Sequence, residues 1–315
     1  MLGQWRKDSV ANPWLGRDGA GLLELDGNLY MLGGWNTAFA APYTSNEVWM
    51  RPKGSQTWQK LSNAPWAPRH TAGWLVHNKK LWVIGGDANS GVYQRDVWCG
   101  TPFQGGVRWS LVTASAPWAS PGRVLHIVFS FLGKIVVLGG QTLDELVPIA
   151  ANKANRANPY YDDIWTSDDE GVTWVQVSTG QPWAPCGMLM GSPVKDGCMW
   201  LIGGGAYDTS GLPRVYKNSI WKSSNITDWE EVTPAAAFPA RQYNAVGVLG
   251  DRLVTSCGWN GANISDLWSS VDGENWKEHR GNPLSPRHAL SLCQVKGELL
   301  VLGGTLTDLN VYALS

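Results

Sequence analysis

The sequence has few charged residues and no long apolar run. Asp, Glu, Lys and Arg make up 16% of the 315 residues, and the formal net charge at pH 7 is −1. This weak charge excludes a general electrostatic attraction to nucleic acid or to a membrane surface. No apolar segment is long enough to span a bilayer, and the start, MLGQWRKDSV, lacks the apolar stretch of a signal peptide. The sequence therefore predicts a soluble protein and leaves its compartment open.

Cysteine and histidine are scarce and form no cluster. The five cysteines are Cys99, Cys186, Cys198, Cys257 and Cys293. Because there is no CxxC pair and the total is odd, they predict neither a disulfide framework nor a zinc site, and we expect buried free thiols. The five histidines are dispersed in the same way. We therefore predict no metal and no cofactor.

Tryptophan, in contrast, is abundant: the chain has 20, against 5 phenylalanines. Most of them belong to a repeat of about fifty residues. Each repeat begins with an apolar run that ends in a glycine pair or, in one unit, in Cys257-Gly258, and the six runs are NLYMLGG, KLWVIGG, KIVVLGG, CMWLIGG, RLVTSCG and ELLVLGG. An aromatic strand follows each pair, then a second tryptophan, and in four linkers a third. This repetition explains most of the tryptophans as packing residues.

The repeat predicts four strands, A to D, in each unit. Gly27, Gly133, Gly197 and Gly297 stand where a tight hairpin would join strands A and B. The last unit lacks strand D within 309–315, and the segment around Trp5 carries its tryptophan. We therefore expect residues 3–10 to pair with 309–315 and to close one domain, 1–315, into a ring without exposed edges.

The glycine pair, the aromatic residue of strand C and the tryptophan of strand D together resemble the repeat of the kelch family. This resemblance implies an all-β fold: a six-bladed propeller with four-stranded antiparallel blades, as in galactose oxidase-like and sialate mutarotase-like kelch proteins. It also implies that the B-to-C loops and D-to-A linkers surround one mouth of the central channel. The long loops 35–46, 141–162 and 205–218 would lie there, as expected for a binding face.

The mouth residues are the candidates for function. Five arginines, Arg17, Arg69, Arg123, Arg241 and Arg287, occupy one repeat position, where the fourth unit has Gly187. Such a collar would attract a carboxylate or phosphate, or would tie linkers together. Trp35 and Trp259 follow glycine pairs and precede Asn36 and Asn260, which suits the stacking and hydrogen bonding of a sugar. Asp87 and Gln141 hold the same position in two other units.

Two further motifs bear on catalysis. His126, Asp87 and Tyr207, with Asp144 and Glu145, are candidate acid–base groups, because proton transfer needs a group of tunable pKa near the substrate. SDDEGVTW at 167–174 and SVDGENW at 270–276 resemble the Asp box of sialidase-type propellers. Those boxes lie in C-to-D turns and are structural, so we expect no catalytic role for them here.

Three functions remain open at this point. The first is a propeller, expected to be monomeric, that binds a carbohydrate or small anionic ligand at the channel mouth. The second is a sugar-acid mutarotase, epimerase or other glycan-active enzyme. The third is a protein-interaction scaffold. No catalytic motif decides between them, because propellers of one fold support all three.

Overall fold

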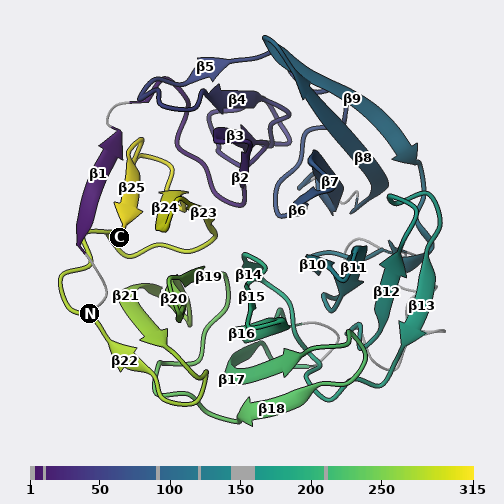
Figure 1. Cartoon of the computed structure of the whole chain (residues 1–315), viewed down its shortest axis with the longest axis vertical. Coiled ribbons are helices and arrows are strands. Elements are labelled where there is room, and N and C mark those ends of the chain that lie inside the picture. The colour runs from purple at the N-terminus through teal and green to yellow at the C-terminus, as the bar shows by residue number, and fades with distance from the viewer. Residues whose placement is uncertain (1–3, 10–11, 90–92, 120–121, 143–159, 209–211) are drawn as a thin grey trace.

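The computed structural model describes residues 4–9, 12–89, 93–119, 122–142, 160–208 and 212–315. Six sheets are arranged in a ring around a central axis (Figure 1). Each sheet is one blade, numbered here from 1 to 6 in the order of its innermost strand. In the described part of the chain the only helix is the short 3-10 turn η1 (Pro117–Ala119). The predicted fold class, an all-β six-bladed propeller, is confirmed.

The first three blades are formed by consecutive strands. Blade 1 contains β2 (Gly21–Leu25), β3 (Asn28–Leu32), β4 (Val48–Arg51) and β5 (Gln59–Lys60). Blade 2 contains β6 (Gly73–His77), β7 (Lys80–Asp87), β8 (Tyr93–Phe103) and β9 (Gly106–Thr113). Blade 3 contains β10 (Ile127–Phe131), β11 (Lys134–Leu138), β12 (Ile164–Ser167) and β13 (Val175–Ser178).

The other three blades repeat this plan with one added strand, in blade 5, and with the fourth strand of blade 6 taken from the start of the chain. Blade 4 contains β15 (Val194–Lys195), β16 (Cys198–Ala206), β17 (Val215–Ser223) and β18 (Glu230–Thr233). Blade 5 contains β19 (Asn244–Leu249), β20 (Arg252–Trp259), β21 (Asn263–Ser270) and β22 (Lys277–Glu278), and β14 (Leu189–Met190) joins β19 in parallel. Blade 6 contains β23 (Leu290–Val295), β24 (Glu298–Gly303), β25 (Val311–Leu314) and β1 (Trp5–Ser9).

Blade 6 takes its outermost strand from the start of the chain. β1 pairs antiparallel with β25, with Trp5 opposite Leu314 and Lys7 opposite Tyr312. Figure 1 shows β1 beside β25, at the rim of the ring. An ionic contact adds to this pairing, because the carboxylate of Asp8 lies between Arg6 and Arg51 of blade 1. The first strand thus joins the last blade to the first.

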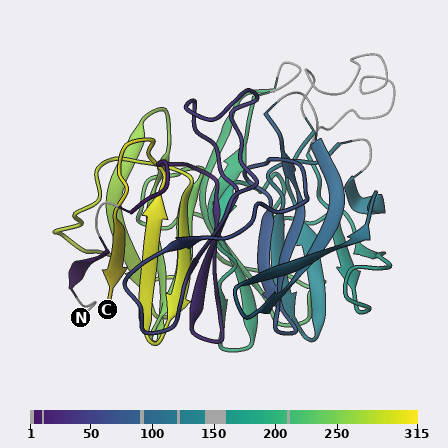
Figure 2. The ribbon, with the colours of Figure 1, turned by 90° about the horizontal axis from the view of Figure 1, so that it is seen from above.

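The core lies between neighbouring blades. Each sheet is covered on both faces, which explains why the second strands are almost uninterrupted apolar runs and do not alternate. In β11, for example, the four residues from Ile135 to Leu138 are all fully buried. Figure 2 shows the blades from the side, with tight hairpins such as that of β23 and β24 (yellow) at one face and the loop after β3 (purple) at the other.

The abundant tryptophans form a repeated aromatic contact in this core. The linker residue of a blade packs edge-to-face on the strand D tryptophan. The five pairs are Trp14–Trp58, Trp66–Trp109, Trp118–Trp174, Trp183–Trp229 and Phe238–Trp276. Their ring centroids are 4.8 to 6.1 Å apart. This geometry favours aromatic pairs and fixes each linker on its blade.

Candidate functional site

Six residues, one from each blade, surround the axis at one end of the channel. They are Gly19, Thr71, Leu125, Met188, Tyr243 and Ala289, and all six have a positive φ. Backbone hydrogen bonds connect them from blade to blade, for example from Tyr243 N–H to the Met188 carbonyl at 2.7 Å. We call this set the axial ring. It narrows the channel and forms the floor of the mouth.

Below the axial ring lies a cavity of about 320 Å³. The innermost strands of the blades line it, with side chains such as Leu22, Ile127 and Val248. Thr71, Leu125, Met188 and Tyr243 also line this cavity, so the axial ring separates it from the mouth. Most of the lining is apolar, which suits a structural channel better than a site for a charged molecule.

The residues that follow the glycine pairs lie immediately above the axial ring. Trp35 pairs with Asp18, Asp87 with His70, and Trp259 with Gln242 through short backbone bridges. Gln141 pairs in the same way with Val124. Each bridge partner directly precedes an axial-ring residue in the sequence. The structure therefore gathers four predicted residues, Trp35, Asp87, Gln141 and Trp259, at one mouth.

Tyr207, the fifth predicted residue at this mouth, crosses between blades 3 and 5. Its N–H donates to Oε1 of Gln141 at 2.6 Å, and its hydroxyl lies 2.6 Å from the hydroxyl of Tyr243. The guanidinium of Arg214 lies over its ring at 4.7 Å and forms an ion pair with Asp208 at 3.0 Å. Burial raises the pKa of Tyr207 and that of Tyr243, so the tyrosine pair is uncharged and can donate hydrogen bonds.

Asp18 is the acid with the most unusual environment at the mouth. Burial raises the pKa of its carboxyl group to about 6, with an opposing effect from nearby His70. Among the described residues no hydrogen bond or ion pair reaches this carboxylate. A carboxyl group with such a pKa can both give and take a proton near neutral pH. The sequence analysis missed Asp18, although its place directly after a repeat arginine, shared with His70 and His288, could have indicated it.

The raised pKa of Asp18 predicts a pH-dependent stability. Because the pKa is higher in the folded than in the unfolded chain, the folded state binds this proton more tightly. The stabilising contribution is complete below pH 4 and is lost as the pH rises through about 6. We therefore expect Asp18→Asn to raise the melting temperature relative to the wild type more at pH 7.5 than at pH 4.5. Thermal unfolding across this range measures it, and a difference that does not change with pH would contradict it.

The two tryptophans of the mouth are half-buried and differ in their support. The Trp259 ring lies 5.7 Å from the ring of His288, which in turn lies 5.6 Å from Tyr243. The indole nitrogen of Trp35 has no hydrogen-bond partner within the described ranges. The side chains of the asparagines that follow these tryptophans, Asn36 and Asn260, are placed differently from each other. Asn36 is buried and bonds the Gly16 carbonyl and the Ala38 amide, while Asn260 is exposed at the loop tip.

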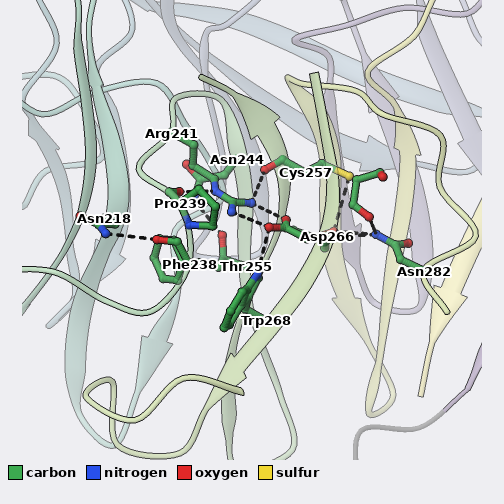
Figure 3. Close-up of polar contacts among 12 residues, drawn as sticks. Asn218, Phe238, Pro239, Arg241, Asn244, Thr255, Cys257, Asp266, Trp268 and Asn282 are labelled. Carbon is green, nitrogen blue, oxygen red and sulfur yellow. Dashed lines mark hydrogen bonds and ion pairs between the residues drawn. The ribbon is translucent and has the colours of Figure 1, made fainter. Parts of the chain in front are cut away.

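The predicted arginine collar lies inside the blades. The side chains of Arg69, Arg123, Arg241 and Arg287, and of Arg17, are at most 1% exposed. Each donates to the carbonyl of the first residue of its glycine pair, at 2.8 to 3.3 Å. Their acidic partners near the start of strand C are Asp96, Asp163, Asp266, Asp308 and Glu47, in the same order. Figure 3 shows Arg241 between Asp266 and the Cys257 carbonyl.

The acidic residue also binds the aromatic residue of strand C. The indole nitrogen of Trp268 donates to Asp266 at 2.8 Å, and Trp98 and Trp165 make the same bond in their blades. The arginine, the acid and the aromatic residue thus form a buried triad that ties strand C to the linker. These guanidinium groups bond protein partners and do not face the mouth.

Blade 4 lacks this triad. The assignment of Gly187 to the arginine position of this blade was wrong. The carbonyl of Cys186 accepts the Gly140 amide at 2.7 Å, as the carbonyl of Arg69 accepts that of Gly34. Cys186, and not the adjacent Gly187, therefore holds the arginine position, because this unit has one more residue before its glycine pair. Ser219 replaces the acid, and the Trp221 indole nitrogen has no partner in the described structure.

His126 lies away from the mouth, in the interface between blades 2 and 3. Its ring is 5.2 Å from that of Trp118, and Nε2 lies 3.1 Å from the Ile84 carbonyl. Burial, with a contribution from the charge of Arg123, lowers its pKa to about 3, so the imidazole is neutral. We assign no acid–base step to it. Asp144 and Glu145 lie outside the described residues.

The Asp-box motif is a turn between β12 and β13. The Gly171 amide donates to Ser167 Oγ at 2.7 Å, and the indole nitrogen of Trp174 donates to the Gly171 carbonyl at 3.0 Å. Hydrogen bonds from Thr173 lower the pKa of Asp169 to about 2.

All five cysteines are free thiols. Within the described ranges, no group of His, Cys, Asp and Glu side chains could hold a metal ion, and no helix is long and apolar enough to cross a membrane.

Comparison with known proteins identifies a relative in structure but none in sequence. No protein-family profile and no curated protein matches the sequence. The solved structure of YjhT superimposes on the chain with a TM-score of 0.72. The chain resembles YjhT in fold. The match covers 96% of this chain and 95% of YjhT at 17% sequence identity, so the likeness extends over the whole ring but shows the fold alone.

Proposed function

We propose that the mouth binds a carbohydrate or small anionic ligand. The observation that carries this proposal is the meeting, at one end of the axis, of half-buried tryptophans, hydroxyl groups and groups of both charges. Trp35 and Trp259 stand beside the axial ring in blades 1 and 5, with blade 6 between them, and offer faces on which a sugar ring can stack. Few polar groups placed among aromatic side chains are typical of sites for small molecules.

The charges of the mouth favour a ligand with both hydroxyl groups and an acidic group. Arg214 is exposed and free to exchange Asp208 for a ligand carboxylate, because a surface ion pair contributes little. Tyr207 and Tyr243 supply hydroxyl groups, and Asp18 and Asp87 supply acceptors for ligand hydroxyls. A sugar acid presents both kinds of group.

Binding should depend on the two tryptophan faces. We expect Trp35→Ala and Trp259→Ala each to weaken the binding of a sugar acid by about tenfold or more, since aromatic stacking contributes on the order of 1 kcal/mol or more. Isothermal titration against a panel of neutral sugars, uronic acids and sialic acids measures this effect. Trp109→Ala, which alters a blade contact far from the mouth, is the control and should lower stability without changing affinity. The absence of binding by every panel member would contradict the proposal.

A second function, mutarotation of a sugar acid, is favoured by Asp18. Opening a cyclic hemiacetal needs a base that takes the proton of the anomeric hydroxyl and an acid that protonates the ring oxygen. Asp18, with its pKa near 6, is suited to the first step, and a tyrosine hydroxyl of the mouth to the second. Ring closure on the other face reverses both transfers and returns the enzyme to its starting state.

Exchange of the two anomers tests this second function. We expect the wild-type protein to accelerate anomer exchange of a uronic or sialic acid, measured by NMR exchange spectroscopy, and Asp18→Asn to lose at least about 100-fold of the acceleration. Trp109→Ala should retain it. An exchange rate that the protein leaves unchanged would remove the mutarotase, while binding in the same sample would preserve the first proposal. Binding of a protein partner at the mouth, without binding of any small ligand, would support the protein-interaction scaffold instead.

A further inference from the structure

One of the six blade junctions differs from the others at the axial ring. At five junctions an axial-ring residue donates its N–H to the axial-ring carbonyl of the preceding blade. The five bonds run from Gly19 to Ala289, Thr71 to Gly19, Met188 to Leu125, Tyr243 to Met188 and Ala289 to Tyr243, at 2.7 to 3.1 Å. Between blades 2 and 3, where both residues are described, Leu125 N–H does not donate to the Thr71 carbonyl.

A second backbone contact fails at the same junction. The second glycine of a pair normally donates its N–H to a backbone carbonyl of the next blade, that of the residue at the repeat-arginine position. Gly34, Gly140, Gly204, Gly258 and Gly304 all do so, at 2.7 to 3.1 Å. Gly86, their counterpart in blade 2, makes no such bond in the described structure. Two backbone contacts that are present at the other five junctions are thus missing between blades 2 and 3.

The side chain of His126 distinguishes this junction from the other five. Blades 1 and 2 have Ala20 and Ala72 at the position of His126, three residues after the repeat arginine. The larger imidazole lies against Gly85, where an added Cβ would be 3.0 Å from its Cε1. Asn244 occupies this position in blade 5 and makes the equivalent bond to the Ile202 carbonyl, yet its junction keeps both backbone contacts. Leu189 and Leu290 hold this position in blades 4 and 6, whose junctions also keep both contacts, so an imidazole here is particular to the junction that lacks them.

The junction of blades 2 and 3 also contains polar side-chain atoms without partners. Thr71 Oγ1 and His126 Nδ1 are buried and make no hydrogen bond within the described part of the chain. Thr71 is 8% exposed and His126 is 6% exposed, and both line the axial cavity. Buried polar atoms normally have partners, and each one without a partner costs about 1–3 kcal/mol. A ligand that supplies these bonds would recover that free energy.

We propose that the junction of blades 2 and 3 binds a neutral hydroxyl group, which a polyol or sugar inserts through the floor of the mouth. The Leu125 N–H needs an acceptor, the Thr71 carbonyl needs a donor, and Thr71 Oγ1 can pair with either. A hydroxyl group satisfies both needs at once. A carboxylate only accepts and an ammonium only donates, so each would leave one backbone group unpaired. This site, the hydroxyl subsite, rests on the proposed function only for the origin of its natural ligand.

Glycerol is a suitable probe, because it is small, neutral and rich in hydroxyl groups. We expect the amide resonance of Leu125, followed in protein labelled with ¹⁵N-leucine, to shift and saturate as glycerol is added. Acetate and ammonium at the same concentrations should leave it unchanged. Thr71→Val, which removes the hydroxyl and keeps the shape, should weaken glycerol binding by about fivefold. Thr71→Ser, which keeps the hydroxyl, is the matched control and should bind like the wild type.

The outcomes separate this inference from the proposed function. A Leu125 resonance that ignores glycerol, or that responds equally to acetate, would overturn the hydroxyl subsite in the wild-type protein, whatever the stability of the variants. The indole resonances of Trp35 and Trp259, titrated with uronic acids, report on the mouth itself. Their shift without a response of Leu125 would preserve the proposed function and remove the subsite. A response of Leu125 to glycerol, without any binding of sugars at the mouth, would support the hydroxyl subsite and remove the proposed function.

Discussion

Replacement of Arg241 by methionine is expected to lower the free energy of unfolding by about 3–5 kcal/mol. The guanidinium is fully buried, and its removal leaves the Asp266 carboxylate, 14% exposed, without its charged partner. It also removes the donor to the Cys257 carbonyl, at 3.0 Å. Urea denaturation followed by tryptophan fluorescence measures the loss. Arg280→Met, at an exposed arginine, is the control and should change stability by less than about 0.5 kcal/mol.

Blade 4 supplies a sharper test of the same pair. It folds with Cys186 and Ser219 in place of the arginine and the acid, so the blade tolerates the loss of both charges together. We expect the double variant Arg241→Cys with Asp266→Ser to be more stable than Arg241→Met alone, because no buried charge is left unpaired. A double variant that loses the sum of both single effects would show that the pair acts through shape and not through charge.

Replacement of Gly139 by alanine is the second change expected to have a large effect. Gly139 is the first glycine of the pair in blade 3, with φ at +63°, and an added Cβ would stand 2.2 Å from the Cys186 carbonyl oxygen. That carbonyl accepts the bond from Gly140 that joins blades 3 and 4. The backbone of the junction must therefore move. We expect the free energy of unfolding to fall by more than about 3 kcal/mol, through strain and the lost contact together.

A glycine in the same blade isolates the contribution of the backbone angle. Gly133, in the hairpin between β10 and β11, has φ at +74°, and an added Cβ would have nothing within 4 Å. Gly133→Ala should lower stability by only about 1–2 kcal/mol, the cost of the left-handed conformation. Chemical denaturation of both variants gives the comparison. Equal losses would mean that the glycine pair is required for its backbone angle and not for the close approach of the next blade.

The fold was predictable from the sequence because its determinants are periodic. Packing of one blade on the next imposes the same requirements six times, so the glycine pair and the tryptophan positions remain visible without any relative for comparison. Gly139 and Trp118 are examples, since each stands at a blade contact that recurs around the ring. The repeat also made most of the tryptophans recognisable as packing residues.

The candidate site was harder to predict because it consists of departures from the repeat. The sequence predicts Trp35, Asp87 and Trp259 as site residues, since they directly follow the glycine pair or its Cys257-Gly258 counterpart. Asp18 was missed because its significance depends on burial, which no spacing shows. For the arginines the error was the opposite one, because a structural residue was taken as a candidate for ligand binding. Their regular spacing suggested a collar, but a side chain that recurs in five blades serves a contact that also recurs, here the ion pair with strand C.

The missing backbone bonds between blades 2 and 3 have a mechanical consequence. A closed ring normally distributes stress evenly, because every junction is held by the same backbone bonds. Here one junction lacks two of them, while the strand pairing of β1 with β25 makes blade 6 a continuous sheet. We therefore expect the first seam to part under heat or pulling force to lie in the middle of the chain, between blades 2 and 3, and not where β1 pairs with β25.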